Sequence, residues 1–441
     1  MSELKIETFC LCRCIFRESR RRPRTWSFMK QFLGRHFEIA GTGERVLPME
    51  GLRALAALLV FFVHFYALFH PYIADGSWAL VVFGTAGAFG HTGVDLFFVL
   101  SGFLIYGILF EKNPKYENFI RRRARRLYPV FLAVFGMYLV LSLVFPGESR
   151  LPHGLSKLLA YIAANLLMLP GMTSITPMIT VAWSLSYEWF FYLAMPLLIA
   201  ALALRRWSSG RRIALFLLLP SLYFVLVSFG IVGRVRLVLF AAGIVIWELV
   251  DRGGLHRLKA WAEYLVAAAF LINILAIGLA GWQRGDSGLV LLDIPWWYTP
   301  SLFVTLLPFC LYSMFYSGFL QRLFSHDYLR WMGNISYSYY LIHGLALHGM
   351  RLLVNRLFPP APRSSIFDVL LLMACLSFSI ICAALLYLVV EKPLSWSAHA
   401  RRPRSVTVSD VSPAGLTPAP EASAEASASL EAGQVRAASS N

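Results

Sequence analysis

The chain has 441 residues, of which 58% are hydrophobic and only 15% are charged, and its formal net charge is +16. A soluble core cannot hide this much apolar surface, so an ordinary soluble protein is excluded and the lipid bilayer is the expected solvent. The basic residues cluster beside apolar runs, so the charge indicates membrane orientation and no nucleic acid partner.

The first 46 residues are expected to form a basic cytoplasmic tail, because they lack the apolar core and cleavage site of a signal peptide. Cys10, Cys12 and Cys14 lie close together in this tail. Their spacing lacks the paired ligands of a zinc module, so we predict neither a metal site nor a disulfide framework.

Ten apolar stretches have the length and composition of membrane-spanning helices. They cover residues 51–71, 91–110, 127–146, 181–204, 213–230, 234–251, 260–281, 298–318, 335–357 and 366–389. A shorter apolar piece at 158–170 is either interfacial or re-entrant, or it crosses as an eleventh span. The predicted fold is therefore an all-α, polytopic transmembrane helix bundle.

Both termini are predicted to be cytoplasmic. With ten spans, most of the 40 lysines and arginines fall in loops on the cytoplasmic side, as the positive-inside rule requires. An eleventh span at 158–170 would place Arg205, Arg206, Arg211 and Arg212 outside. Residues 403–441 are rich in Ala, Ser and Pro, which predicts a disordered tail.

The first span carries two ionisable residues, Arg53 and His64. They are eleven residues apart, which puts them on one helical stripe about 16 Å apart. Ionisable groups inside a span are costly, and this favours a functional role. The structural alternative is that Arg53 reaches the headgroups and that His64 forms a hydrogen bond in the bundle core.

The next two features are a buried carboxylate and an arginine cluster. Asp95 lies in the second span, within the run from Gly93 to Phe103, and we interpret it as structural. Five arginines follow within residues 121–126 on the predicted cytoplasmic face. Such a cluster is suited to the phosphates of coenzyme A, although it is also typical of a topology anchor.

The fourth span opens with Trp183, Ser186, Tyr187 and Glu188. Glu188 is predicted at a depth similar to that of His64. A carboxylate beside an imidazole can fix its tautomer and stabilise the imidazolium, which suits activation of a hydroxyl group. A structural ion pair or a proton relay is the alternative.

Two further ionisable residues lie near the cytoplasmic ends of later spans. His343 is in the ninth span and Glu391 follows the tenth. Either is predicted to line a donor channel or to form a structural pair at the interface.

Taken in order, these segments resemble the bacterial acyltransferase-3 family of integral-membrane O-acyltransferases, which includes O-antigen acetylases. The resemblance covers about residues 47–397. It rests on Arg53 and His64, the run from Gly93 to Phe103, Arg122-Arg123 with Arg126 and Pro129, Trp183-Ser184-Leu185 with Glu188, Ser336-Tyr337 with Tyr340 and His343, and Glu391 with Pro393. Glu50 departs from the family pattern, where Asp is common.

The resemblance implies that His64 is catalytic, that Glu188 belongs to the same site, and that Arg53 and the arginine motif bind the donor. The matching arginines are Arg122, Arg123 and Arg126. It also implies an acyl-coenzyme A donor, with acetyl favoured, and a hydroxyl acceptor on a cell-surface carbohydrate, glycolipid or related molecule. The expected location is the bacterial inner membrane, with acyl-coenzyme A as co-substrate and no tightly bound cofactor.

We hypothesise that Glu188 orients His64 as the general base and that Trp183 or Tyr187 stabilises the oxyanion. Direct transfer is the default, and an acyl-enzyme on His64 or Ser186 stays open. The rival interpretation is a transporter or flippase in which His64 and Glu188 relay protons.

Overall fold

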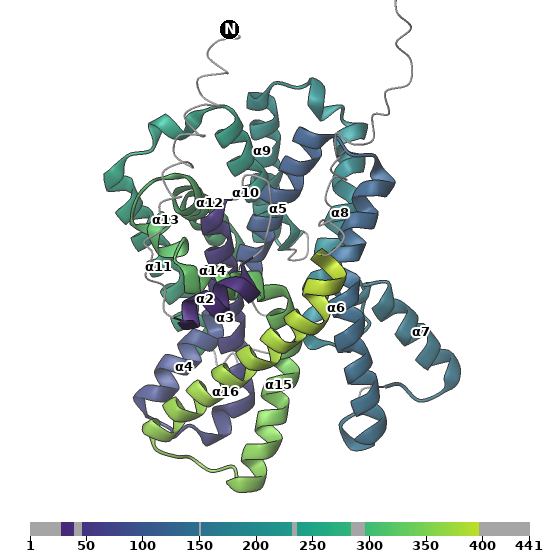
Figure 1. Ribbon diagram of the computed structural model, residues 1–441. Helices are drawn as coiled ribbons and strands as arrows, with labels where there is room; N and C mark the ends of the chain where they lie inside the picture. Colours follow the sequence, from purple (N-terminus) through teal and green to yellow (C-terminus); the bar gives the residue numbers. More distant parts are fainter. Residues whose placement is uncertain (1–27, 39–45, 150, 232–235, 284–295, 397–441) are drawn as a thin grey trace, which may run out of the picture. The chain divides into compact units, whose positions relative to one another are not determined.

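The computed structural model describes residues 28–38, 46–149, 151–231, 236–283 and 296–396. These residues fold almost entirely into helices (Figure 1), and an isolated bridge between Ile73 and Arg363 is the β-type pairing recorded among them. The cysteine cluster at residues 10–14 and the tail at 403–441 lie outside the described residues.

Eight segments of the described residues are long and apolar enough to cross a membrane. This finding makes the chain a multi-pass membrane protein. The segments contain α3 (Leu47–Phe69), α4 with α5 (Trp78–Phe89 and Thr92–Lys112), α6 (Tyr116–Val144), α8 (Trp183–Ala201), α9 (Ser209–Ser228), α11 (Ala260–Gln283), α12 (Tyr298–Phe315) and α16 (Ser365–Leu386).

The other two predicted spans also form helices, but they do not meet this standard. Helix α10 (Leu239–Asp251) has 13 residues, or about 20 Å at the α-helical rise, which is short of the hydrocarbon thickness. Helix α15 (Ser336–Leu357) is long enough, but polar residues interrupt its apolar sequence. Both helices pack inside the bundle, against α5 and against α3 and α16 respectively.

The 158–170 piece becomes α7 (Leu155–Leu166), a helix of 12 residues. Its length of about 18 Å is too short to cross the bilayer alone. The chain then runs through two short 3₁₀ turns, Pro170–Met172 and Thr180–Ala182, before α8 begins. This geometry favours the interfacial or re-entrant interpretation over an eleventh span.

Helix α4 is a correction, because it lies between the predicted spans 51–71 and 91–110, where no helix was predicted. The Ser77 hydroxyl caps the helix by accepting a hydrogen bond from the Leu80 amide at 3.1 Å. Small residues let α4 approach α3 and α11 closely: a Cβ at Gly84 would lie 2.4 Å from the Trp282 ring, and one at Gly87 would lie 2.9 Å from Tyr66. Tertiary packing therefore stabilises a helix that the charge pattern could not reveal.

Part of the predicted amino-terminal tail is also helical. Helix α2 (Phe28–Phe37) contacts α14 (Asp327–Asn334). The Asn334 amide donates to the Phe37 carbonyl at 3.0 Å, and the Lys392 ammonium donates to the His36 carbonyl at 2.7 Å. Nearby, Arg330 pairs with Glu50 at 3.2 Å, so the glutamate that departs from the family pattern has a structural partner.

Helices α5 and α10 meet backbone to backbone. A Cβ at Gly102 would lie 2.1 Å from the Phe240 carbonyl oxygen, and one at Gly243 would lie 2.0 Å from the Val99 carbonyl oxygen. Glycine is required at both positions because any side chain would push the helices apart. This contact fixes the helix that supplies one wall of the pocket described next.

Candidate active site

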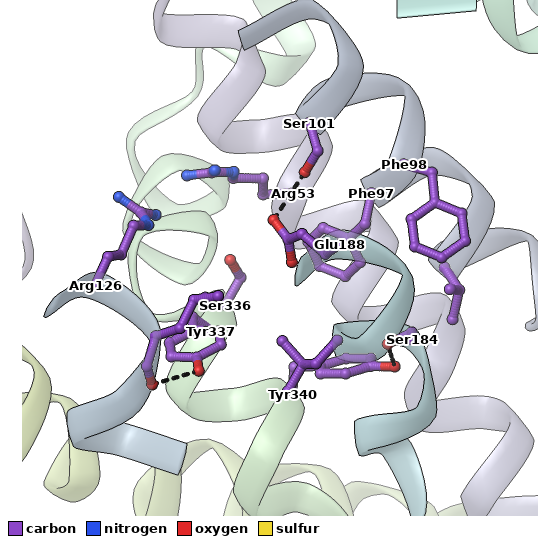
Figure 2. A pocket seen from close by; sticks show the side chains of 13 residues that line it. Arg53, Phe97, Phe98, Ser101, Arg126, Ser184, Glu188, Ser336, Tyr337 and Tyr340 are labelled. Atoms are coloured by element: carbon purple, nitrogen blue, oxygen red, sulfur yellow. Dashed lines mark hydrogen bonds between the residues drawn. The ribbon is translucent and has the colours of Figure 1, made fainter. Parts of the chain in front are cut away.

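A pocket lies inside the bundle, between α3, α5, α6, α8 and α15 (Figure 2). The space within it is about 590 Å³, which includes open solvent at its mouth. It is lined by Arg53, Val94, Phe97, Phe98, Ser101, Arg126, Leu127, Ser184, Leu185, Glu188, Ser336, Tyr337 and Tyr340.

Three of the predicted site residues meet in this pocket: Arg53, Arg126 and Glu188. Figure 2 shows the two guanidinium groups on one side and the rings of Phe97 and Phe98 on the other. Arg53 interacts electrostatically with both Arg126 and Glu188. Two positive charges and one negative charge therefore face the same pocket.

Glu188 is held by two hydroxyl groups. Ser101 of α5 donates to Glu188 Oε1 at 3.1 Å, and Tyr192, one turn further along α8, donates to the same oxygen. These bonds direct the carboxylate into the pocket, where Figure 2 shows it beside Ser101.

The arginine cluster divides into two groups on α6. Arg121, Arg122 and Arg125 are exposed, whereas Arg123 and Arg126, three residues apart, turn inward. Arg126 lines the pocket, but Arg122 does not, although the family motif includes it. The guanidinium of Arg123 lies 5.4 Å from the centre of the Phe119 ring, and its buried Nε has no hydrogen-bond partner among the described residues.

Helix α15 supplies the polar wall opposite α6. The Tyr337 hydroxyl donates to the Leu127 carbonyl at 2.7 Å, and the Tyr340 hydroxyl contacts the Ser184 hydroxyl at 2.6 Å. These tyrosines belong to the motif that begins at Ser336, but they were not predicted as site residues. Their spacing of three residues, which places both on one face of a helix, was the available signal.

Glu391 is buried within the chain's last described helical segment, Tyr387–Trp396. It accepts a hydrogen bond from Ser338 at 2.6 Å and interacts electrostatically with Arg126 and Arg53. Glu391 does not line the pocket.

The structure gives His64 a different partner from the predicted one. The ring of His64 contacts the ring of His343, with Nδ1 of His64 3.3 Å from Nε2 of His343, whereas Glu188 is bonded to Ser101 and Tyr192. Neither histidine lines the pocket. His343 is nevertheless one helical turn beyond Tyr340, and the two ring centres are 6.1 Å apart.

The remaining predicted residues of α8 face other surroundings. Ser186 is buried and accepts a hydrogen bond from the Gly171 amide at 3.0 Å, which holds the loop before α8. Trp183 and Tyr187 pack edge to face with ring centres 5.8 Å apart. None of these three residues lines the pocket.

A second buried polar cluster lies beside Trp183. Arg236 stacks 5.6 Å from the Trp183 ring and lies 3.6 Å from Asp95, which also accepts a hydrogen bond from Tyr298 at 2.8 Å. The structure thus gives the intramembrane carboxylate Asp95 a cationic partner, in agreement with its structural interpretation. Arg236 was not singled out from the sequence, although it lies near the start of the predicted span at 234–251.

Comparisons with known proteins identify the family. The acyltransferase-3 model, described as an acyltransferase domain, matches residues 48–389. The chain is 28% identical to acyltransferase MdmB of Streptomyces mycarofaciens over 389 residues, which is 81% of this chain and 94% of that protein.

Two other relatives match over shorter regions. Exopolysaccharide production protein ExoZ of Rhizobium meliloti is 34% identical over 106 residues, or 23% of this chain and 32% of ExoZ. O-acetyltransferase OatA of Staphylococcus aureus is 29% identical over 172 residues, or 36% of this chain and 25% of OatA. No solved structure matches significantly. The family model covers most of the chain, including every residue that lines the pocket, and the chain therefore belongs to the acyltransferase-3 family of membrane acyltransferases.

Proposed function

We propose that this membrane acyltransferase takes an acyl group, with acetyl favoured, from acyl-coenzyme A at the cytoplasmic face of the bacterial inner membrane. The acceptor is a hydroxyl of a cell-surface carbohydrate, a glycolipid or a related molecule. One observation carries the proposal: Arg53 and Arg126 converge on a pocket whose opposite wall, at Tyr340, is one helical turn from His343 and its contact with His64.

The arginines support an anionic donor. Guanidinium groups bind phosphate oxygens in pairs, which suits the phosphates of coenzyme A. Arg53 and Arg126 both line the pocket. Their guanidinium groups would bind the phosphate oxygens, while the pantetheine arm follows the stripe of about 16 Å from Arg53 toward His64.

The chemistry requires only a base and a positioned thioester. His64 accepts the proton of the acceptor hydroxyl as its oxygen attacks the thioester carbon, and the tetrahedral intermediate then expels the coenzyme A thiolate. That thiolate takes the proton back from His64. The products are an ester and free coenzyme A, and His64 returns to its starting state.

The acceptor class is supported by the names of two relatives. OatA is an O-acetyltransferase and ExoZ is an exopolysaccharide production protein. The first name indicates an oxygen acceptor and the second a polysaccharide, and a hydroxyl on a carbohydrate fits both.

The test uses inverted membrane vesicles that carry the protein and endogenous acceptors, so that added acetyl-coenzyme A meets the cytoplasmic face. We expect free thiol release and acetyl transfer to a glycan or lipid fraction with wild type, and neither with His64→Ala. Wild-type vesicles that release no thiol would reject the proposal and favour a transporter. A stable acetyl adduct on purified protein given donor alone would replace direct transfer with an acyl-enzyme.

A further inference from the structure

The contact between His64 and His343 determines which ring nitrogen carries each proton. Nδ1 of His343 lies 3.1 Å from the Tyr339 carbonyl oxygen and 2.8 Å from the Tyr340 carbonyl oxygen. A carbonyl oxygen only accepts hydrogen bonds, so Nδ1 of His343 must carry a proton. In a neutral imidazole the other nitrogen, Nε2, then has a free lone pair.

The same reasoning extends to His64. Its Nδ1 lies 3.0 Å from the Val60 carbonyl oxygen and 3.3 Å from Nε2 of His343. Both of these neighbours are acceptors, so Nδ1 of His64 carries a proton and donates to both. Nε2 of His64 is then the lone-pair nitrogen, which is the form that a general base needs.

The opposite assignment creates a conflict. If His343 were charged, its Nε2 would donate to His64 Nδ1, and the Nδ1 lone pair would then face the Val60 carbonyl oxygen without a proton between them. A charged His343 is also costly because its side chain is fully buried. The neutral arrangement satisfies all four contacts.

No carboxylate takes part in this arrangement. Within the described part of the chain, neither histidine forms a hydrogen bond to an acidic side chain, and the Tyr339 ring stacks parallel to His343 with centres 5.5 Å apart. When His64 accepts a proton, its Nδ1–H stays bonded to two neutral acceptors. The pair is therefore a neutral version of the carboxylate–histidine device found in many hydrolases.

We propose that His343 is the positioning residue of His64: it accepts the Nδ1 proton and so holds His64 with Nε2 as the base. This inference rests on the proposed function, in which His64 removes the proton from the acceptor. It replaces Glu188, the residue that the sequence suggested for this role, and leaves Glu188 to the donor pocket.

Two variants of His343 separate this role from a structural one. The side-chain amide of His343→Gln reaches the place of Nε2 and can accept from His64. The amide of His343→Asn reaches only the place of Nδ1, so it keeps the bonds to the backbone carbonyls and loses the contact with His64. Both variants are polar and smaller than histidine, which makes them a matched pair.

The kinetic measurement is acetyl transfer at matched levels of folded protein. We expect His343→Asn to lower kcat about 100-fold with little change in KM for acetyl-coenzyme A, as loss of a general base would, and His343→Gln to stay within about fivefold of wild type. An active His343→Asn beside an inactive His343→Gln would overturn the inference, and so would equal losses in both.

A second measurement does not depend on activity. The ¹⁵N spectrum of histidine-labelled protein reports the tautomer of His64, and we expect a protonated Nδ1 and a free Nε2 in wild type, with a mixture in His343→Asn. A single unchanged tautomer in both proteins would contradict the positioning role. If the spectrum agrees but wild type transfers no acyl group, then the proposed function fails while this geometry stands.

Discussion

Ser101 donates a 3.1 Å hydrogen bond to Glu188, and this contact joins α5 to α8 beside the two arginines of the pocket. The carboxylate offsets the positive charge of these arginines in a medium of low dielectric constant. Its role therefore depends on whether an anionic ligand is present.

Replacement of Glu188 by glutamine should make the protein more responsive to its donor. Glu188→Gln keeps an oxygen for Ser101 and Tyr192 but removes the negative charge next to Arg53. We expect a lower Tm without ligand, and a larger rise of Tm on adding coenzyme A than wild type shows, because the phosphates then replace the missing charge. A smaller rise of Tm than in wild type would indicate that the phosphates of coenzyme A bind away from Glu188 and Arg53.

The arginines of α6 should differ in their effect on donor binding. Arg126→Ala removes a guanidinium from the pocket, and we expect KM for acetyl-coenzyme A to rise by about tenfold to a hundredfold, which corresponds to about 1.5–3 kcal/mol for a hydrogen bond to a charged group. Arg122→Ala is the control, since this side chain is exposed. We expect Arg122→Ala to change KM by less than about twofold. If the two variants raised KM equally, the arginines would bind the donor only through their net positive charge.

The close contact between α5 and α10 predicts a strong effect from a single methyl group. Gly102→Ala places a Cβ 2.1 Å from the Phe240 carbonyl oxygen, and we expect a loss of about 1–3 kcal/mol in the free energy of unfolding. Gly136→Ala in α6 has open space around the new Cβ and should be neutral or gain about 0.5–1 kcal/mol. Thermal unfolding in detergent measures both, and a stable Gly102→Ala would show that the helices are not in backbone contact.

The sequence predicted the helical class and the membrane setting well, because apolar length and composition are local properties. The number of spans was harder to predict. Helix α10 is short and packs against α5. Helix α4 is stabilised by contacts with Tyr66 and Trp282, which lie on other helices, so the local sequence of α4 does not reveal these contacts.

The site, like the fold, could be predicted only in part from the sequence. The sequence pointed to Arg53, Arg126 and Glu188, which meet in the pocket, because ionisable residues inside spans are few. It could not predict their pairing. Similar depth suggested that Glu188 would reach His64, but depth does not fix the direction of a side chain around a helix, and the structure turns Glu188 toward Ser101 and His64 toward His343.

In the proposed mechanism, His64 is the base for acyl transfer to a hydroxyl at the cell surface. The most direct test is mass spectrometry of surface glycans and lipids from cells lacking this protein, complemented with wild type or His64→Ala at matched membrane levels. We predict that wild type restores an acyl mass increment and that His64→Ala does not, in which case the modified molecule identifies the acceptor. Equal restoration by both would contradict the mechanism and leave His64 with a structural role.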